Sequence, residues 1–369
     1  MSPAACKPKA DSEVVDPCRP TTLGTGFAPL LQAIVNTMDA QAGPSSNKLV
    51  VPTASDRDNF AASVIALLRN DPPATNRMQP NCGLPASYRL VRIADPNAGD
   101  VVVAAEIDAK GTPNPSLYWG TYATRAGSAP PGRDLVVEVP HPLFDHNTWR
   151  EGADLFLQGR ARFFLMTGAH RCANPMPTTC SGKTDVCGAP NVMVPFAISD
   201  AAHSLAVPFF GVHSLLSQKF AELSFLQLHR EGSTGCPAAL LSDGSRSFPK
   251  TGSIVTLSAA LDRAGVVVGH CNERPISDGG VDAASDGGAD AGTDSSALVY
   301  PNPACALCGE TNVEARFTAG SADACLKQGP TQNRLILFEQ SAALAENPSG
   351  SRKGYQVVID AVLGSFPAR

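Results

Sequence analysis

Four strand-like runs of this chain end on side chains that could do chemistry. In chain order these side chains are His141 with Asp145, His170 with Arg171, His229, and Glu339. Open, mostly parallel α/β sheets bind their ligands at the carboxyl ends of the strands. Residues that lie far apart in the sequence are therefore expected to converge on one site.

These residue types suit a zinc site with a general base beside it. Zinc in hydrolytic sites prefers three protein ligands from His and Asp or Glu, and it keeps a fourth position for the water that it activates. His141, Asp145 and His229 fit this pattern. Glu339 ends an apolar run and is the carboxylate expected to move protons near the metal. We therefore predict Zn²⁺ as the cofactor.

Each assignment has a structural alternative. A single His after a strand is often a surface or hydrogen-bonded residue, and Asp145 is a candidate cap for a helix that starts near Asn147 or Thr148. Glu138 is a second acidic candidate for the metal. Side chains alternate along a strand, however, so Glu138 is expected on the opposite face from His141. Asp145 is the preferred ligand.

The elements that must position these residues follow from the pattern of apolar residues. From about residue 133, short β-rich runs alternate with helical stretches, which is typical of βαβ units. Helices are predicted within 26–43, 55–70 and 355–366, and 252–259 is predicted as a strand. The expected fold class is α/β, with a mixed, mostly parallel sheet and helices on both faces.

Composition also divides the chain. The Asp/Gly/Ala/Ser tract at 276–298 cannot bury enough apolar surface to offset its ordering entropy, so we predict that it is disordered. It lacks the ligand spacing and terminal glutamate of an EF-hand calcium loop. We expect a cysteine-containing amino-terminal tail and helix at 1–48. One α/β hydrolase-type domain with a β-rich lead-in is expected to occupy 49–275 and 299–369.

Several classes of protein are disfavoured. A formal net charge of -5 gives no basic footprint for nucleic acid. The longest apolar runs fall far short of the roughly 20 residues of a membrane-spanning helix. No G-x-S-x-G elbow occurs in the chain, which argues against a serine hydrolase. We therefore expect neither a nucleic-acid partner nor a membrane span.

Cysteine usage indicates an oxidising compartment. Nearly all of the 11 cysteines lie in loops rich in Pro, Gly, Ser and Asn, which favours disulfides in a secreted, periplasmic or lipid-anchored bacterial protein. Small residues precede Cys6, as at the cleavage point of a lipoprotein signal, so Cys6 is a candidate lipid anchor; the alternative is a plain soluble tail. Cys305 and Cys308 form a lone CxxC, for which disulfides are favoured over half a zinc site or a redox pair.

Five segments between residues 133 and 365 carry a resemblance to a known group. They are "PHPLFDHNT", "SDAAHSLAVPF", "FLQLHRE", "NVEARF" and "RLILFEQS". Together they resemble the zinc-dependent exopeptidases and amidohydrolases, which include carboxypeptidases, N-formylglutamate amidohydrolases, succinylglutamate desuccinylases and phage poly-γ-glutamate hydrolases. The resemblance implies a zinc exopeptidase-type fold, ligands at His141, Asp145 and His229, and a catalytic base at Glu339. Carboxypeptidases space the first pair as His-x-x-Glu, whereas this chain has His-x-x-x-Asp and no glycine-rich turn around His141.

The resemblance also implies a substrate that carries a carboxylate. It assigns Arg171 and Arg316 as carboxylate binders, in keeping with the bidentate geometry of a guanidinium. His170, His203 and Asn312 are predicted on the same substrate-binding side. His170 ends a strand beside Arg171, so it is also a candidate metal ligand or a group that polarises a substrate carbonyl; the alternative is a hydrogen-bonded loop residue.

His203 begins a helix-like stretch for which Asp200 or Ser199 is a natural cap. One of these two residues is therefore expected to cap that stretch.

Together these observations predict a zinc-dependent hydrolase. Its expected substrate is the amide bond of an N-acylated amino acid, a γ-glutamyl compound or a peptide, cleaved by metal-activated water. The alternative is a non-catalytic secreted or lipid-anchored surface-binding protein on the same fold. The zinc content of the purified chain separates the two.

Overall fold

A computed structural model describes most of the chain. The described residues are 18–70, 76, 79–95, 99–126, 132–231, 236–245, 247–271, 298–300, 307–346, 348 and 353–368. Cys6, Cys305 and nearly all of the tract at 276–298 lie outside these residues. The last residue of that tract, Leu298, is described and opens a short strand.

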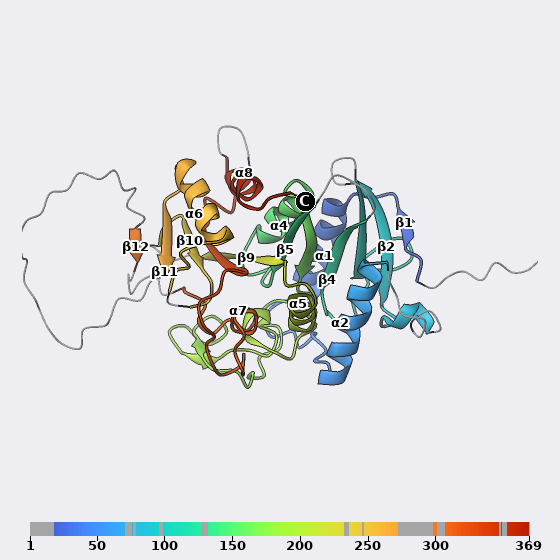
Figure 1. Ribbon diagram of the computed structural model, residues 1–369. Helices are drawn as coiled ribbons and strands as arrows, with labels where there is room; N and C mark the ends of the chain where they lie inside the picture. Colours follow the sequence, from blue (N-terminus) through green and yellow to red (C-terminus); the bar gives the residue numbers. More distant parts are fainter. Residues whose placement is uncertain are drawn as a thin grey trace, which may run out of the picture.

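One large sheet forms the centre of the molecule (Figure 1). Its strands are β1 (Thr21–Leu23), β2 (Tyr88–Asp95), β3 (Gly99–Glu106), β4 (Thr121–Ala126), β5 (Arg133–Val139), β6 (Ala161–Met166), β9 (Ser224–Glu231), β10 (Ala239–Ser242), β11 (Val268–Cys271), β12 (Leu298–Tyr300) and β13 (Leu335–Ser341). They lie in the order β1-β2-β3-β4-β6-β5-β9-β13-β10-β11-β12. A separate two-stranded sheet pairs β7 (Lys183–Thr184) with β8 (Val194–Pro195).

Strand direction changes across the sheet. The central strands β6, β5, β9 and β13 are parallel to one another, whereas β2, β3 and β4 form an antiparallel meander beside them. Strand β10 is antiparallel to β13, and β11 and β12 continue parallel to β10. The predicted mixed, mostly parallel sheet is therefore confirmed.

Helices cover both faces of this sheet (Figure 1). They are α1 (Phe27–Gln41), α2 (Ala54–Leu68), α4 (Thr148–Leu157), α5 (Pro208–Lys219), α6 (Ser253–Arg263), α7 (Val313–Thr318) and α8 (Gln356–Ser365), with 3-10 turns η1 (Pro80–Gly83) and η2 (Ala201–His203). Helix α4 packs against α1 and α8, and α8 against α6. Helix α5 packs against α2 and α7. The helices predicted from the apolar pattern near both ends of the chain are confirmed by α1, α2 and α8.

The strand predicted at 252–259 is wrong, because this segment forms most of α6. Its β-branched residues suggested a strand, but Ile254, Leu257 and Leu261 are all buried at a spacing of three and four residues, which is the helical period. The strand in this part of the sheet is β10, a four-residue run that the sequence prediction missed.

Four disulfides join eight of the described cysteines to one another. The pairs are Cys18–Cys82, Cys172–Cys187, Cys180–Cys325 and Cys271–Cys308. Because Cys308 bonds to Cys271, it serves neither as half of a zinc site nor in a redox pair with its CxxC partner. Disulfides of this kind persist outside the reducing cytosol, so they indicate an extracytoplasmic location. Within the described residues, no helix is both long and apolar enough to cross a membrane.

Candidate metal centre

His141 and Asp145 come from one tight turn after β5. The backbone N–H of Asp145 donates to the carbonyl oxygen of His141 at 2.8 Å, which closes a single helix-like turn. A four-residue spacing on such a turn brings both side chains to the same side, and Asp145 Oδ2 lies 3.3 Å from His141 Nδ1. The extra residue relative to His-x-x-Glu is therefore accommodated by this turn.

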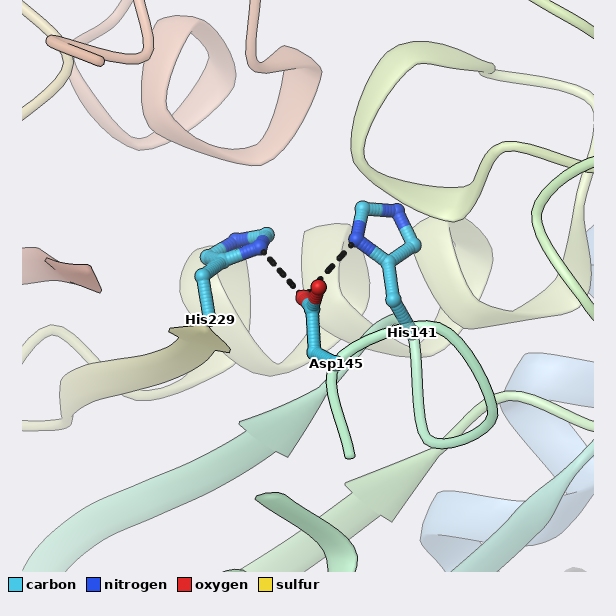
Figure 2. A group of neighbouring side chains, drawn as sticks. All are labelled: His141, Asp145 and His229. Atoms are coloured by element: carbon cyan, nitrogen blue, oxygen red, sulfur yellow. Dashed lines mark hydrogen bonds and ion pairs between the residues drawn. The ribbon is translucent and has the colours of Figure 1, made fainter. Parts of the chain in front are cut away.

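His229 reaches the same carboxylate from a neighbouring strand. It lies near the carboxyl end of β9, which pairs in parallel with β5, and its Nδ1 is 3.2 Å from Asp145 Oδ2. Figure 2 shows the two imidazole rings on either side of Asp145, with their centroids 5.1 Å apart. One ligand atom from each of the three residues lies within 4.8 Å of the others. The three predicted ligands are therefore close together and buried.

The other nitrogen of each ring shows which tautomer the site favours. His141 Nε2 lies 2.9 Å from Asp200 Oδ1, and because an ionised carboxylate can only accept, this nitrogen carries a proton. His229 Nε2 lies 2.9 Å from the side-chain oxygen of Gln227 and also donates. Both neutral imidazoles then present the Nδ1 lone pair to Asp145.

This donor set fits a divalent metal ion. Without a cation, hydrogen bonds to Asp145 at both Nδ1 atoms would require His141 and His229 to be charged. Two neutral imidazoles and one carboxylate are a typical zinc ligand set, and a second hydrogen bond from each His to an acceptor is typical of orienting partners. His141, Asp145 and His229 are the residues that would hold the ion.

The electrostatics of the site favour an ionised Asp145. Burial raises the pKa of this carboxyl, but its contacts with His141 and His229 outweigh burial, so that the pKa lies well below its usual range. Burial lowers the pKa of His229, while Glu339 and Asp145 raise it, with a net increase. The anionic ligand is therefore available throughout the neutral range.

Glu339 faces the ligands from β13. It is paired in register with His229 on the adjacent parallel strand β9, and it lines the same cavity. Burial raises the pKa of Glu339, His229 lowers it and Asp145 raises it, with a net increase. A carboxyl with a raised pKa is better matched to exchanging protons near neutral pH.

A cavity of about 530 Å³ opens in front of the ligands. Its lining includes the strand ends that carry His141, His229 and Glu339, and the loop residues 183–186 and 309–312. This volume lies within the range of small-molecule sites. The cavity therefore suits a small ligand or the end of a chain.

Arg171 lines this cavity and is held firmly by Asp200. Its Nε and Nη2 donate to Asp200 Oδ2 at 3.0 and 2.6 Å, and its guanidinium carbon lies 5.2 Å from the ring centroid of Phe144. The remaining nitrogen, Nη1, takes no part in this ion pair. Of the two predicted carboxylate binders, Arg171 is thus placed at the cavity.

Arg316 lies elsewhere. Its Nε donates to the carbonyl oxygen of Glu310, and its Nη1 donates to Ser181 Oγ at 3.0 Å and to the carbonyl oxygen of Cys325 at 2.8 Å. The side chain is buried and does not line the cavity. The structure therefore does not bring Arg316 to the substrate, because its guanidinium is used to hold the loop around Ser181.

The other predicted substrate-side residues have mixed positions. His203 lines the cavity, stacks on Phe196 and hydrogen-bonds Asp200 Oδ1 through Nδ1 at 2.9 Å, and burial lowers its pKa to about 4. His170 does not line the cavity. Its Nδ1 accepts from the backbone N–H of Cys172 at 3.0 Å, and burial lowers its pKa to about 4, so it stays neutral at pH 7.

Asn312 lines the cavity, but both ends of its amide are engaged. Its Oδ1 accepts from the backbone N–H of Ala315 at 2.8 Å and caps α7, and its Nδ2 donates to the Gln227 side-chain oxygen. Glu138, the rejected alternative ligand, is fully buried, with Oε1 2.7 Å from His213 Nδ1. It takes no part in the ligand cluster.

Two residues that support the site were missed. Asp200 was expected to cap the turn at η2, but its side chain makes no capping bond and instead pairs with Arg171 and with His141 and His203. Burial raises the pKa of Asp200, and these three cations or potential cations lower it well below its usual range. Gln227 stands two residues before His229 on β9, so the two-residue period of a strand could have identified it.

Comparison with known proteins finds similarity in structure only. No protein-family model and no curated protein matches the chain. The structure is similar to succinylglutamate desuccinylase from Vibrio parahaemolyticus, with 8% identity and a TM-score of 0.35 over 77% of this chain and 80% of that one. It is also similar to N-formylglutamate amidohydrolase from Ralstonia eutropha, with 12% identity and a TM-score of 0.32 over 64% and 92% of the two chains. A putative carboxypeptidase A from Shewanella denitrificans is similar as well, with 13% identity and a TM-score of 0.27 over 75% of this chain and 76% of that one. These proteins are of the same kinds as those the sequence motifs resemble.

Proposed function

We propose that this protein is a zinc-dependent hydrolase that cleaves an amide bond. The observation that carries the proposal is the convergence of His141, Asp145 and His229, with Glu339 in register beside them on one cavity. The proposed substrates are N-acylated amino acids, γ-glutamyl compounds or peptide ends. Arg171, which lines the cavity, supports a substrate with a carboxylate, because a guanidinium is well suited to bind such a group.

The roles of the chain's own residues follow from the geometry. A bound zinc ion supplies a polarised scissile carbonyl and a water of lowered pKa. Glu339 takes the proton from the attacking water and then delivers it to the leaving amine, so that one carboxyl serves both proton transfers. Asp200 holds both His141 and Arg171, which couples the orientation of a ligand to that of the substrate-binding cation.

Zinc content and amidase activity test this proposal together. We expect one zinc per chain, loss of amidase activity on a panel of N-acyl amino acids and dipeptides after chelation, and recovery when zinc is restored. Glu339→Gln should keep its zinc and lose about 10²–10⁴-fold in kcat, which is the usual share of a general base. A Gln328→Glu variant, outside the cavity lining, provides a control for the effect of an amide–carboxyl exchange.

A chain that carries no zinc after preparation in zinc-supplemented buffer would support the non-catalytic binding protein instead. Activity that survives both chelation and Glu339→Gln would contradict the proposed mechanism.

We also propose an extracytoplasmic bacterial protein that is secreted, periplasmic or anchored through lipid on Cys6. The disulfides support this location. Metabolic labelling with a radioactive fatty acid, compared between the wild type and Cys6→Ser, tests the anchor.

A further inference from the structure

A buried amide stands behind one of the proposed zinc ligands. Gln227 is completely buried on β9, and its side-chain oxygen accepts from His229 Nε2 at 2.9 Å and from the amide of Asn312. Its side-chain nitrogen donates to Glu138 Oε2 at 3.0 Å. Both ends of the amide are therefore engaged, and the contacts with Glu138 and Asn312 specify which end is nitrogen and which is oxygen.

The contacts beyond the amide strengthen this orientation. Glu138 Oε1 lies 2.7 Å from His213 Nδ1, and His213 Nε2 lies 2.9 Å from Thr318 Oγ1. An anionic Glu138 can only accept, so the end of Gln227 that faces it must be the NH₂ group. The oxygen is then directed to His229.

A second carboxyl lies in the same cluster. Burial, and then the charge of Glu138, raise the pKa of Glu314 well above its usual range. Among the described residues neither carboxyl oxygen of Glu314 has a hydrogen-bond partner, so Glu138 is the acceptor of the Gln227 amide.

We propose that Gln227, oriented by Glu138 and Asn312, is a positioning residue that selects the Nε2–H tautomer of His229 and so turns the Nδ1 lone pair toward the metal. This inference rests on the proposed metal site. It assigns Asn312 a role behind the ligand in place of direct substrate binding. It also makes zinc affinity depend on Glu138, which touches none of the three ligands.

Asp145 favours the opposite tautomer of His229. Asp145 lies 3.2 Å from His229 Nδ1, and an anionic carboxylate alone favours a proton on that nitrogen. A tautomer with Nδ1–H cannot bind zinc through Nδ1. The positioning effect of Gln227 is therefore measurable as a change in the balance between the two tautomers.

The test compares two matched substitutions, Gln227→Met and Gln340→Met. Gln340 is also completely buried in the sheet, and its side-chain nitrogen also donates to a buried glutamate, Glu151. It lies on β13 and lines no part of the cavity. Both variants lose a buried amide of the same kind, but only Gln227→Met removes the acceptor of His229.

Two readouts are measured for each variant. Zinc affinity is obtained by competition with a chromophoric chelator, and the tautomer of His229 is obtained from long-range ¹H–¹⁵N NMR of the metal-free protein at pH 9. We expect Gln227→Met to weaken zinc binding about 10–100-fold, as loss of an orienting partner typically does, and to shift His229 toward Nδ1–H. Gln340→Met should change neither quantity by more than about twofold, the scatter of such measurements around an unaffected site.

A second variant covers the case in which Gln227→Met fails to fold. Glu138→Gln keeps the shape of its side chain and removes the charge that orients Gln227, so a loss of zinc affinity below about 10-fold is expected, with the same shift of tautomer.

Unchanged tautomer populations in Gln227→Met and Glu138→Gln would overturn the inference. If the wild type binds no zinc at all, the proposed function fails, while the NMR comparison in the metal-free protein still decides the role of Gln227.

Discussion

The edge of the sheet that carries the proposed zinc ligands and the loop wall of the cavity are held by different restraints. His141, Asp145 and His229 are fixed by two parallel strands, one tight turn and hydrogen bonds that the two histidines donate to buried partners. The cavity-lining residues 183–186 belong to a loop with only two short strands, β7 and β8. Two disulfides, Cys172–Cys187 and Cys180–Cys325, fasten that loop to itself and to the segment after α7.

This difference separates two tasks. Catalytic geometry requires ligands on rigid elements, and the sheet provides them without any covalent restraint. A binding wall can be built from irregular chain, provided that something replaces the missing backbone pairing. Here the missing backbone pairing is replaced by the disulfides and by Arg316, which donates to the carbonyl oxygen of Cys325. The two regions should therefore respond to different perturbations.

The largest effect is expected at a ligand. His141→Ala should reduce zinc affinity by more than the roughly 100-fold that loss of an orienting partner costs, because a coordinating atom itself is removed. All disulfides should still form, since the loop does not depend on the metal. Zinc stoichiometry and a free-thiol assay measure the two outcomes. His146→Ala changes an exposed neighbour and serves as the control. Free thiols in His141→Ala would show that the two regions are not independent.

The converse change acts on the loop. The double substitution Cys172→Ser with Cys187→Ser removes a disulfide between residues 15 positions apart. This should lower the free energy of unfolding by about 3 kcal/mol and raise KM for the amide substrate. Zinc affinity should stay within about twofold of the wild type, because no ligand or orienting partner lies in the loop. Denaturant unfolding and chelator competition measure these values.

The matched control for this variant is the double serine substitution at Cys18 and Cys82, a disulfide that joins segments outside the cavity lining. It should lower stability without raising KM. If the loop variant lost zinc as well, the wall and the ligands would share their restraints, and the comparison above would be wrong.

The same contrast explains what could be predicted from the sequence. The ligands and Glu339 were predictable because they end or follow regular strands, and parallel neighbouring strands bring their carboxyl ends to one edge. Glu138 does stay out of the cluster, but strand parity is not the reason, because it pairs in register with Gln227 on the face of the sheet that also carries His229.

Residues that depend on irregular chain were less predictable. Arg171 follows strand β6 and Arg316 lies on helix α7, yet only Arg171 lines the cavity, because the loop between 172 and 187 folds in a way that no local period specifies. Asp200 was taken for a cap for the same reason. In α6, three consecutive β-branched residues hid a helical spacing of buried residues that only tertiary packing made decisive.

A further prediction concerns the sheet alone. Glu151 on α4 is completely buried against Gln340 on β13, and burial raises its pKa to about 8. A carboxyl whose pKa is raised on folding stabilises the protein in its protonated form, so stability should fall as pH rises from about 4.5 toward 8. Glu151→Gln mimics the protonated form and should remove this dependence, giving a relative gain of about 2 kcal/mol between pH 6 and pH 8.

Urea unfolding across that pH range measures the effect. The contact of Glu151 with Gln340 does not involve the disulfide loop. KM should therefore follow the same pH profile in the wild type and in Glu151→Gln. Parallel stability curves for the wild type and Glu151→Gln would contradict the proposed burial of a neutral carboxyl.

The smallest expected effect distinguishes the two arginines. Arg171→Lys keeps a positive charge beside Asp200 but loses the paired donors and the free Nη1, so KM for a carboxylate-bearing substrate should rise about 10-fold, or about 1.4 kcal/mol. Arg316→Lys loses donors to main-chain oxygens of the loop and should lower stability with a smaller rise in KM. Each variant is measured on pairs of substrates that differ only in the carboxylate. Only Arg171→Lys should reduce the difference in KM between the two members of a pair. If Arg316→Lys reduced this difference in KM equally, both arginines would affect binding only by supporting the loop, and the carboxylate would bind elsewhere in the cavity.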